Sequence, residues 1–141
     1  MKFRKIIFAI VGAGLVGVLI TFYMYNKPHT NYEKLKPEYT LACEQLVADF
    51  ERDEQAANTK YLNKMLLVNG NIVDVSGNDA GEVTIALNDP MFGVTCNFNA
   101  QQTEKQSGLI KQLKVGKEVK IKGRCDGLLT DVRLTQCSVV E

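Results

Sequence analysis

The stretch "KVGKEVKIKGRCDG", residues 114–127, alternates polar and apolar side chains and is the clearest indication of fold in the chain. A period of two places successive side chains on opposite faces of a β-strand. The positions expected on the buried face are Val119, Ile121, Gly123 and Cys125, and those on the other face are Lys120, Lys122 and Arg124. The three cations are therefore either a ridge for phosphate groups or the solvent side of a strand.

Four further segments have strand character: residues 65–77, 81–90, 93–98 and 131–140. Gly70 inside the first of them indicates a bulge or a sharp bend. Residues 101–114 break the alternation and predict a short helix or turn. A glycine-bent first strand and a helical insert between the third and fourth strands are typical of the five-stranded oligonucleotide/oligosaccharide-binding (OB) barrel, which we assign to residues 64–141. The fold is therefore expected to be mainly β.

Residues 39–63, ahead of the barrel, carry apolar side chains at three- and four-residue steps. This period predicts a flanking amphipathic α-helix, with Thr40 as its candidate N-cap. Residues 26–38 contain two prolines and no apolar period, so we expect a linker. His29, the single histidine, lies in that linker, which is a poor frame for a catalytic or metal-binding group.

The N-terminal 25 residues have the composition of a membrane anchor. Three cations in residues 1–5 precede an uncharged run at residues 6–25, and a helix of that length spans about 30 Å of hydrocarbon. The run ends in bulky residues, so we expect an uncleaved transmembrane helix rather than a cleaved signal peptide or a buried soluble helix. Because the cations precede the span, residues 1–5 are expected to be a cytoplasmic tail and the remainder to be exported.

Small residues recur every fourth position in this predicted anchor, at Ala9, Ala13 and Gly17. Small residues at this spacing let two membrane helices approach closely. A homodimer through this stripe is therefore one expectation.

Two groups of residues resemble a known family. The first is an Ala-Asn…Lys-Tyr…Lys stretch, formed by Ala57, Asn58, Lys60, Tyr61 and Lys64. The second is a hairpin pattern, formed by Gly123, Cys125, Gly127, Asp131, Val132, Leu134 and Cys137. Over residues 40–140 the chain resembles the bacterial tRNA-anticodon-binding-like (tRNA_anti-like) family of OB folds. The resemblance implies an OB barrel behind a membrane or export segment, hence a single-pass protein of the bacterial inner membrane with a periplasmic barrel, and implies no settled activity.

OB barrels that bind single strands combine a cationic groove with aromatic platforms on the second and third strands. The side chains expected to face outward there are neither aromatic nor basic: Thr84, Ala86, Asn88, Thr95, Asn97 and Asn99. Residues 28–141 contain 13 basic and 16 acidic residues, a net charge of −3, whereas nucleic-acid-binding domains usually have a basic excess. We therefore expect a partner other than nucleic acid.

Four binding candidates remain on the barrel. Phe92, in the loop between the second and third strands, is the one candidate for base stacking, although a loop phenylalanine commonly packs against the protein. Lys120, Lys122 and Arg124 are the cationic candidates, and we interpret them as the solvent side of their strand.

The chain has four cysteines, an even number that favours disulfides over a metal site in an exported domain. No Cys-x-x-Cys pair occurs, so no metal is expected. Cys96 and Cys125 share inward parity and Cys137 lies on a strand expected near both, so we expect one bridge among these three. Cys43 either pairs with the remaining cysteine or stays buried as a small apolar residue. The spacing leaves the pairing open.

Catalysis needs a nucleophile with a base, or paired acids in a pocket. The single histidine and the scattered carboxylates form no such set by spacing, so we expect neither an enzyme nor a cofactor. The chain is interpreted as a membrane-anchored, exported OB-fold module that binds another envelope protein or a small ligand and assists an envelope complex. The alternative is a single-stranded nucleic-acid-binding OB domain.

Overall fold

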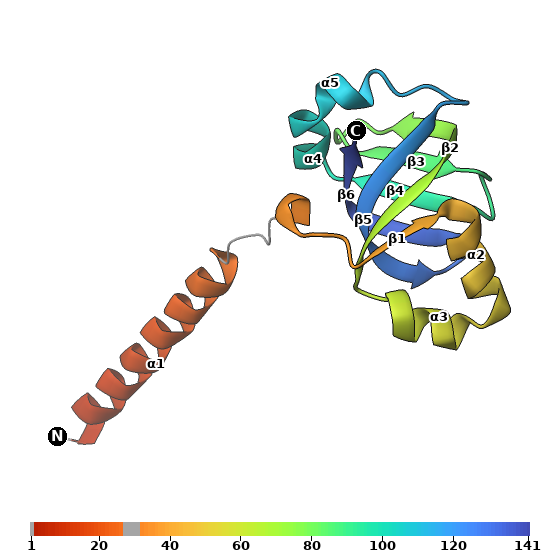
Figure 1. The fold of residues 1–141 in the computed structure, drawn as a ribbon. Coiled ribbons are helices and arrows are strands. Elements are labelled where there is room, and N and C mark those ends of the chain that lie inside the picture. The colour runs from red at the N-terminus through yellow and green to blue at the C-terminus, as the bar shows by residue number, and fades with distance from the viewer. Residues whose placement is uncertain (1, 27–31) are drawn as a thin grey trace. The chain divides into compact units, whose positions relative to one another are not determined.

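The computed structural model describes residues 2–26 and 32–141 (Figure 1). The chain divides into two units, Met1–Thr30 and Asn31–Glu141. The first holds helix α1 (Lys2–Tyr25), of which Ile6–Tyr25 is long and apolar enough to cross a membrane. His29 and the side chain of Ala9 lie outside the described residues, so the small-residue stripe stays a prediction.

Five strands of the second unit close into a barrel, as the alternation predicts. They are β2 (Met65–Gly77), β3 (Val83–Leu87), β4 (Val94–Phe98), β5 (Glu118–Leu128) and β6 (Val132–Val140). Neighbouring strands follow the order β2-β3-β4-β6-β5, and β5 pairs with β2 to complete the ring. The β4–β6 pair is parallel, whereas the other four pairs of the ring are antiparallel.

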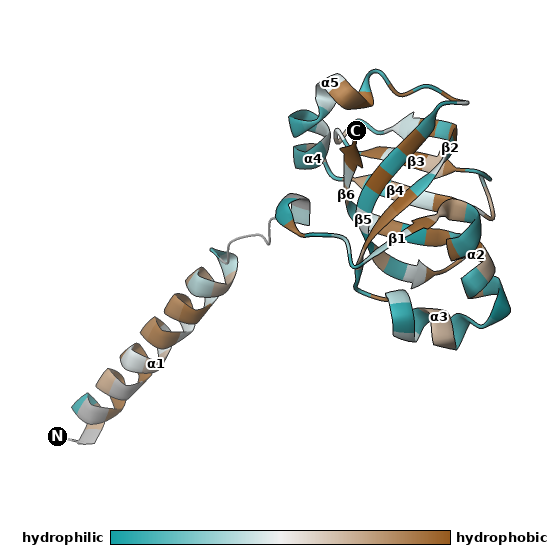
Figure 2. Ribbon diagram, in the orientation of Figure 1, coloured by the Kyte–Doolittle hydropathy of each residue, from teal (hydrophilic) through white to brown (hydrophobic). Residues whose placement is uncertain are grey.

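The alternation of inward- and outward-facing side chains along each strand determines which residues form the core. On β5 the four positions expected to be buried are buried, while Lys120 is exposed, and Figure 2 shows apolar and polar residues alternating along this strand. The apolar residues of β4, Val94, Cys96 and Phe98, are also buried as predicted. Ala86, expected on the outer face of β3, is buried as well.

The predicted helical insert is present as α4 (Ala100–Lys105) and α5 (Ser107–Ile110), between β4 and β5. A capping box starts α4: Gln102 N donates to Asn99 Oδ1 (2.9 Å) and Asn99 N donates to Gln102 Oε1 (3.0 Å). The two bonds satisfy backbone donors that a helix start leaves without partners. Ile110, at the end of α5, is buried in the core.

Residues 39–63 differ from the single helix that we predicted. They form strand β1 (Tyr39–Ala42), helix α2 (Cys43–Arg52) and helix α3 (Glu54–Tyr61). β1 pairs in parallel with the first part of β2. This edge of β2 is open because β3 pairs with β2 only from Ile72 onward. This tertiary pairing overrides the local helical period, so Thr40 lies in a strand and Ala42 takes the N-cap position of α2.

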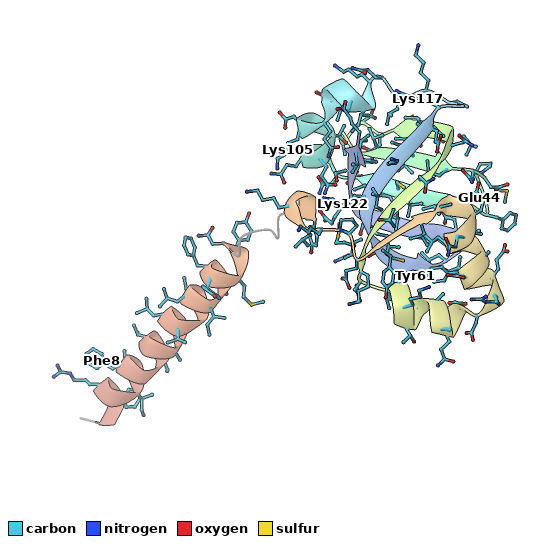
Figure 3. All side chains as sticks on the ribbon, viewed as in Figure 1. Phe8, Glu44, Tyr61, Lys105, Lys117 and Lys122 are labelled. Atoms are coloured by element: carbon cyan, nitrogen blue, oxygen red, sulfur yellow. The ribbon has the colours of Figure 1, made fainter. Side chains whose placement is uncertain are left out.

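The second half of the predicted linker belongs to the folded domain. It begins with the short 3-10 helix η1 (Tyr32–Lys34). Lys122 Nζ donates to the carbonyl oxygen of Leu35 (3.0 Å), and the guanidinium of Arg124 lies 5.9 Å from the centre of the Tyr32 ring. Figure 3 shows Lys122 beside this segment. The cations of β5 therefore hold residues ahead of the barrel against its outer surface.

We predicted a bulge or a sharp bend at Gly70, and the structure shows a close approach of neighbouring side chains at this position. The register of β2 with β3 shifts between Ile72 and Asp74, two residues farther on. A Cβ on Gly70 would lie 2.8 Å from Asn88 Oδ1 and 3.0 Å from the Cβ of Cys43. That amide oxygen of Asn88 accepts a hydrogen bond from the backbone N–H of residue 71 (2.8 Å), so it is not free to move away.

We expect Gly70→Ala to lower the free energy of unfolding by about 1–3 kcal/mol, because the added methyl group overpacks this contact. Gly108→Ala is the matched control, since a Cβ there meets nothing within 4 Å, and alanine is favoured over glycine in a helix by about 1 kcal/mol. Urea unfolding followed by circular dichroism measures both. Wild-type stability in Gly70→Ala would contradict the close-approach argument.

The Ala-Asn…Lys-Tyr stretch lies on α3 and contacts both α2 and the β5–β6 hairpin. Tyr61 is buried, and its hydroxyl donates to Asp49 Oδ2 (2.7 Å) on α2. A Cβ on Gly127, whose φ is +94°, would lie 3.0 Å from Asn58 Oδ1. Three of the residues that carry the family resemblance, Asn58, Tyr61 and Gly127, are therefore packing residues of the helices and the hairpin.

The hydroxyl of Tyr61, together with the nearby cations Lys60 and Arg52, holds the pKa of Asp49 below its ordinary value. A carboxyl group whose pKa is lower in the folded state stabilises the fold at pH values above its unfolded pKa, which is about 3.9 for aspartate. This contribution is lost as the pH falls through the folded pKa.

We expect Tyr61→Phe to lower the free energy of unfolding by about 1.5–3 kcal/mol at neutral pH, because the hydrogen bond to a charged acceptor is lost while the ring is kept. The difference from wild type should shrink as the pH falls below about 3.9, where the carboxyl group becomes protonated. Urea unfolding across this pH range measures it. A difference that stays constant with pH would show that Asp49 does not carry the effect.

Candidate functional site

A polar groove of about 450 Å³ crosses the outer face of β3, β4 and β6 and reaches the adjoining parts of β5 and α4. Amide and hydroxyl side chains dominate its lining, which consists of Glu82, Thr84, Asn97, Phe98, Asn99, Gln102, Asp126, Arg133, Thr135 and Gln136. In OB barrels the face of the second and third strands is the usual ligand surface. These strands are β3 and β4 here, so the groove is the candidate site.

Hydrogen bonds between side chains fix the orientation of several groups in the groove. Thr84 Oγ1 donates to Asn97 Oδ1 (3.0 Å) across the β3–β4 pair, where the two residues lie directly opposite. Gln102 Nε2 donates to Gln136 Oε1 (2.8 Å), which links α4 to β6. These bonds fix the orientation of the amide groups of Asn97, Gln102 and Gln136.

A charged cluster forms the β5 side of the groove. Arg124 Nε donates to Asp126 Oδ1 (3.1 Å), and Thr135 Oγ1 donates to Asp126 Oδ2 (2.9 Å). The Asp126 carboxylate is thus held by one partner on its own strand and one on β6. Arg124 forms an ion pair with Asp126 and a cation–π contact with the Tyr32 ring.

The electrostatics of the groove do not favour a phosphate backbone. Its lining carries two carboxylates, Glu82 and Asp126, and one guanidinium, Arg133. The aromatic residue among the described lining residues is Phe98, whose side chain is buried, so it offers no stacking surface. The groove can instead exchange hydrogen bonds with neutral polar groups.

The structure does not bring the predicted cationic candidates together as a ligand ridge. Lys122 and Arg124 hold the segment ahead of the barrel. Lys120 borders a different hollow, between α5 and the end of β6, which Lys117 also lines. In Figure 3, Lys117 lies beside the start of β5, and Lys122 lies farther along this strand. The interpretation of these cations as the outer side of a strand is consistent with this placement.

Phe92 is exposed rather than packed against the protein. It lies in the β3–β4 loop with 60% of its surface accessible, beside Met91 at 61%. The Asp89 carboxylate accepts hydrogen bonds from the backbone N–H groups of Met91 and Phe92 (both 2.8 Å), and these bonds hold the pKa of Asp89 below its ordinary value. Residue 93 in this turn must be glycine, because a Cβ there would clash with the carbonyl oxygen of Leu87. The loop therefore presents two apolar side chains on a well-defined backbone.

This apolar loop lies at the end of the β3–β4 pair next to Leu87 and Val94, whereas the groove residues Thr84 and Asn97 lie toward the other end. The backbone N–H of Val132 donates to the carbonyl oxygen of Gly93 (3.2 Å), which joins the β3–β4 loop to the start of β6. Leu129, in the turn before β6, is also exposed. We call Met91, Phe92 and Leu129 the apolar rim. Sequence reasoning found Phe92 but missed its neighbours, because a single exposed residue in a turn has no periodic signal.

All four cysteines are buried free thiols. Burial, with smaller effects from Cys96 and Glu44, raises the pKa of Cys43 to about 12. The side chain of Cys137, together with burial, raises the pKa of Cys96 well above its ordinary value. The structure contains no disulfide between these cysteines, so the bridge expected among Cys96, Cys125 and Cys137 stays a prediction. Within residues 2–26 and 32–141 no three His, Cys, Asp or Glu side chains gather as metal ligands would.

Comparison with known proteins places the chain in a family. The tRNA_anti-like family model matches residues 1–139. No curated protein matches the chain. A lipoprotein from Klebsiella pneumoniae subsp. pneumoniae, provisionally described as nucleic acid-binding, has a similar structure: identity is 24%, the TM-score is 0.59, and the match covers 72% of this chain and 91% of that one.

Two further solved structures match less closely. The S. pombe Stn1–Ten1 complex gives 15% identity and a TM-score of 0.43, over 55% of this chain and 58% of that one. The yeast Stn1 and Ten1 structure gives 14% identity and a TM-score of 0.46, over 73% and 63%. The family match, which extends over nearly the whole chain, shows that this protein belongs to the tRNA_anti-like family of OB folds.

Proposed function

We propose that this protein is a membrane-anchored, exported OB-fold module that binds a segment of another envelope protein across the groove on β3, β4 and β6. The observation that carries the proposal is the polar groove, together with the exposed apolar rim on the loops at one end of the same strands. Methionine and aromatic residues are enriched at protein interfaces, and backbone amides of a partner match the asparagine and glutamine groups of the groove.

The anchor supports the envelope setting of the proposal. Helix α1 contains an apolar segment of 20 residues, preceded by three cations. Cations gather on the cytoplasmic side of a membrane helix, so this distribution favours an exported barrel. The lipoprotein among the similar structures is consistent with attachment to a membrane.

A second candidate function is binding of single-stranded nucleic acid. Phe92 favours it, because an exposed ring on a rigid loop can stack on a base, a contact worth about 1–3 kcal/mol. The description of the Klebsiella lipoprotein points the same way. The net charge of −3 over residues 28–141 and the two carboxylates in the groove oppose it.

A photo-crosslinking amino acid placed at Phe92 or Arg133 should capture one discrete protein in native membranes, because both positions border the proposed interface. Lys111 is the matched control, since it is exposed but lies outside the groove lining. Adducts are read by gel shift and mass spectrometry. Equal labelling from all three positions would refute the interface, and adducts that nuclease digests would establish the second candidate.

Fusing alkaline phosphatase after Glu141 should give active enzyme, because that reporter folds only after export. A fluorescent protein that matures only in the cytoplasm, fused at the same position, is the reciprocal control and should stay dark. A fluorescent fusion with inactive phosphatase would place the barrel in the cytoplasm and remove the envelope part of the proposal.

A further inference from the structure

The basic residues of the folded domain are concentrated in one stretch of the chain. Residues 105–124 contain seven of the 13 basic residues found in residues 28–141 and one of the 16 acidic residues, Glu118, so this stretch has a net charge of +6. The remainder of residues 28–141 has six basic and 15 acidic residues, a net charge of −9. The domain therefore combines a low net charge with a strong separation of charge, and such a separation attracts charged partners.

Four of these cations are exposed and form no ion pair among residues 2–26 and 32–141. They lie between the end of α5 and the first part of β5, and we call them the lysine patch: Lys111, Lys114, Lys117 and Lys120. Figure 3 shows Lys117 at the upper end of the domain, near α5, and Tyr61 at the lower end, beside α3. The patch is thus a surface feature of one end of the domain.

A well-defined turn lies in the middle of the lysine patch. The backbone N–H of Lys117 donates to the carbonyl oxygen of Lys114 (3.1 Å), and Gly116 has φ = +86°, a conformation that favours glycine. Two further bonds fix the turn to β2: Gly116 N donates to the carbonyl oxygen of Ile72 (2.7 Å), and Ile72 N donates to that of Lys117 (3.0 Å). Val115, between the two lysines, keeps 66% of its surface exposed.

Apolar surface continues from the turn into a hollow of about 430 Å³, whose lining includes two members of the lysine patch, Lys117 and Lys120. The carboxylates of the lining are Glu118 and Glu141. Five of the lining residues are apolar: Leu109, Leu113, Val119, Val139 and Val140. All but Val119 are half-buried and so are partly open to solvent. Lysines that border apolar surface are typical of segments that bind at a membrane interface, where the apolar groups reach the acyl boundary.

We propose that the lysine patch and Val115 dock the folded domain on the anionic phospholipid surface of the membrane that holds its own anchor. The lysines contact the phosphate groups of the lipids, and Val115 contacts the boundary between headgroups and acyl chains. The inference rests on the membrane anchor of the proposed function and does not depend on the groove.

The chain itself brings this surface close to the domain. Six residues, 26–31, separate the end of α1 from the start of η1 in sequence, and six residues span about 20 Å when fully extended. A short tether raises the effective concentration of the bilayer at the domain. Each lysine near an anionic bilayer strengthens the attraction about fivefold, so four lysines favour the docked state.

The phosphate groups of a nucleic acid are the competing occupant of the lysine patch. Proteins that bind single strands add aromatic rings on which the bases stack. The described lining of the adjoining hollow contains no aromatic residue, and Val115 offers no ring. The apolar surroundings of the lysines therefore favour lipid over nucleic acid.

Fluorescence of the full-length protein in nanodiscs tests the docking. An environment-sensitive fluorescent amino acid replaces Val115 in one sample and Gln55, which is exposed on α3, in the control sample. Each protein is reconstituted with phosphatidylcholine alone and with added phosphatidylglycerol. The emission wavelength and the quenching by acrylamide are measured in 0.1 M and 1 M salt, between which the Debye length falls from about 10 Å to about 3 Å.

At position 115 we expect emission at shorter wavelength and weaker quenching only in the anionic nanodiscs at 0.1 M salt, with no change at position 55. Identical signals from position 115 in both lipids, or a shift that persists in 1 M salt, would overturn the docking. Protein that does not co-elute with the nanodiscs would overturn the anchor instead. Failure of the groove as an interface leaves these signals unchanged, so the failures are distinguishable.

Charge reversal identifies the residues responsible. Lys114→Glu/Lys117→Glu should lower the ratio of docked to undocked domain by about 30-fold or more, because two lysines of about fivefold each are lost. Lys34→Glu/Lys36→Glu is the matched control, since it changes the net charge equally at exposed lysines outside the patch, and it should keep the shift.

Two outcomes of this comparison would overturn the assignment. An equal loss of the shift in both variants would attribute it to net charge rather than to the lysine patch. A shift at position 115 that a single-stranded oligonucleotide produces in the neutral nanodiscs would assign the patch to nucleic acid. Circular dichroism checks that both variants are folded.

Discussion

The parallel pairing of β4 with β6 is the constraint on which the rest of the domain depends. Without it the chain would be an open sheet with two unpaired edges, which are prone to pair with other chains. Closure gives every strand of the ring an inner face, and it brings Thr84 and Asn97 next to Arg133 and Thr135 on the outer face. The core and the groove are therefore products of the same pairing.

The cations of β5 show that contacts within the protein determine whether charged side chains on a strand are available to a ligand. A row of alternating lysines and arginines has the appearance of a phosphate site, yet Lys122 and Arg124 are engaged by the segment ahead of the barrel and by Asp126. Each such surface contact contributes only about 0–1 kcal/mol. Their effect lies in position: they make residues 32–38 part of the domain and take two cations away from any ligand.

The OB fold and the family membership do not by themselves specify a ligand, since one fold supports many functions through different surface residues. The surface residues of this chain combine neutral amides and hydroxyls with an exposed apolar rim. A nucleic-acid site would reverse both features, with cations in the groove and aromatic rings on the strands. These features are the basis of the proposed protein partner.

Side-chain parity and hydrophobic length are local properties, so the five barrel strands, the helical insert and the apolar N-terminal helix can be predicted from the sequence. That Tyr39–Ala42 is a strand depends instead on tertiary structure, because it pairs with an edge of β2 that β3 leaves open. The same holds for the groove, where Gln102 meets Gln136, and for Lys122, which meets the carbonyl group of Leu35. These pairs are far apart in the chain, and a backbone shift at one residue, Gln136, changes which side chains face inward. No periodic pattern records such a shift, since it is set by the strand opposite.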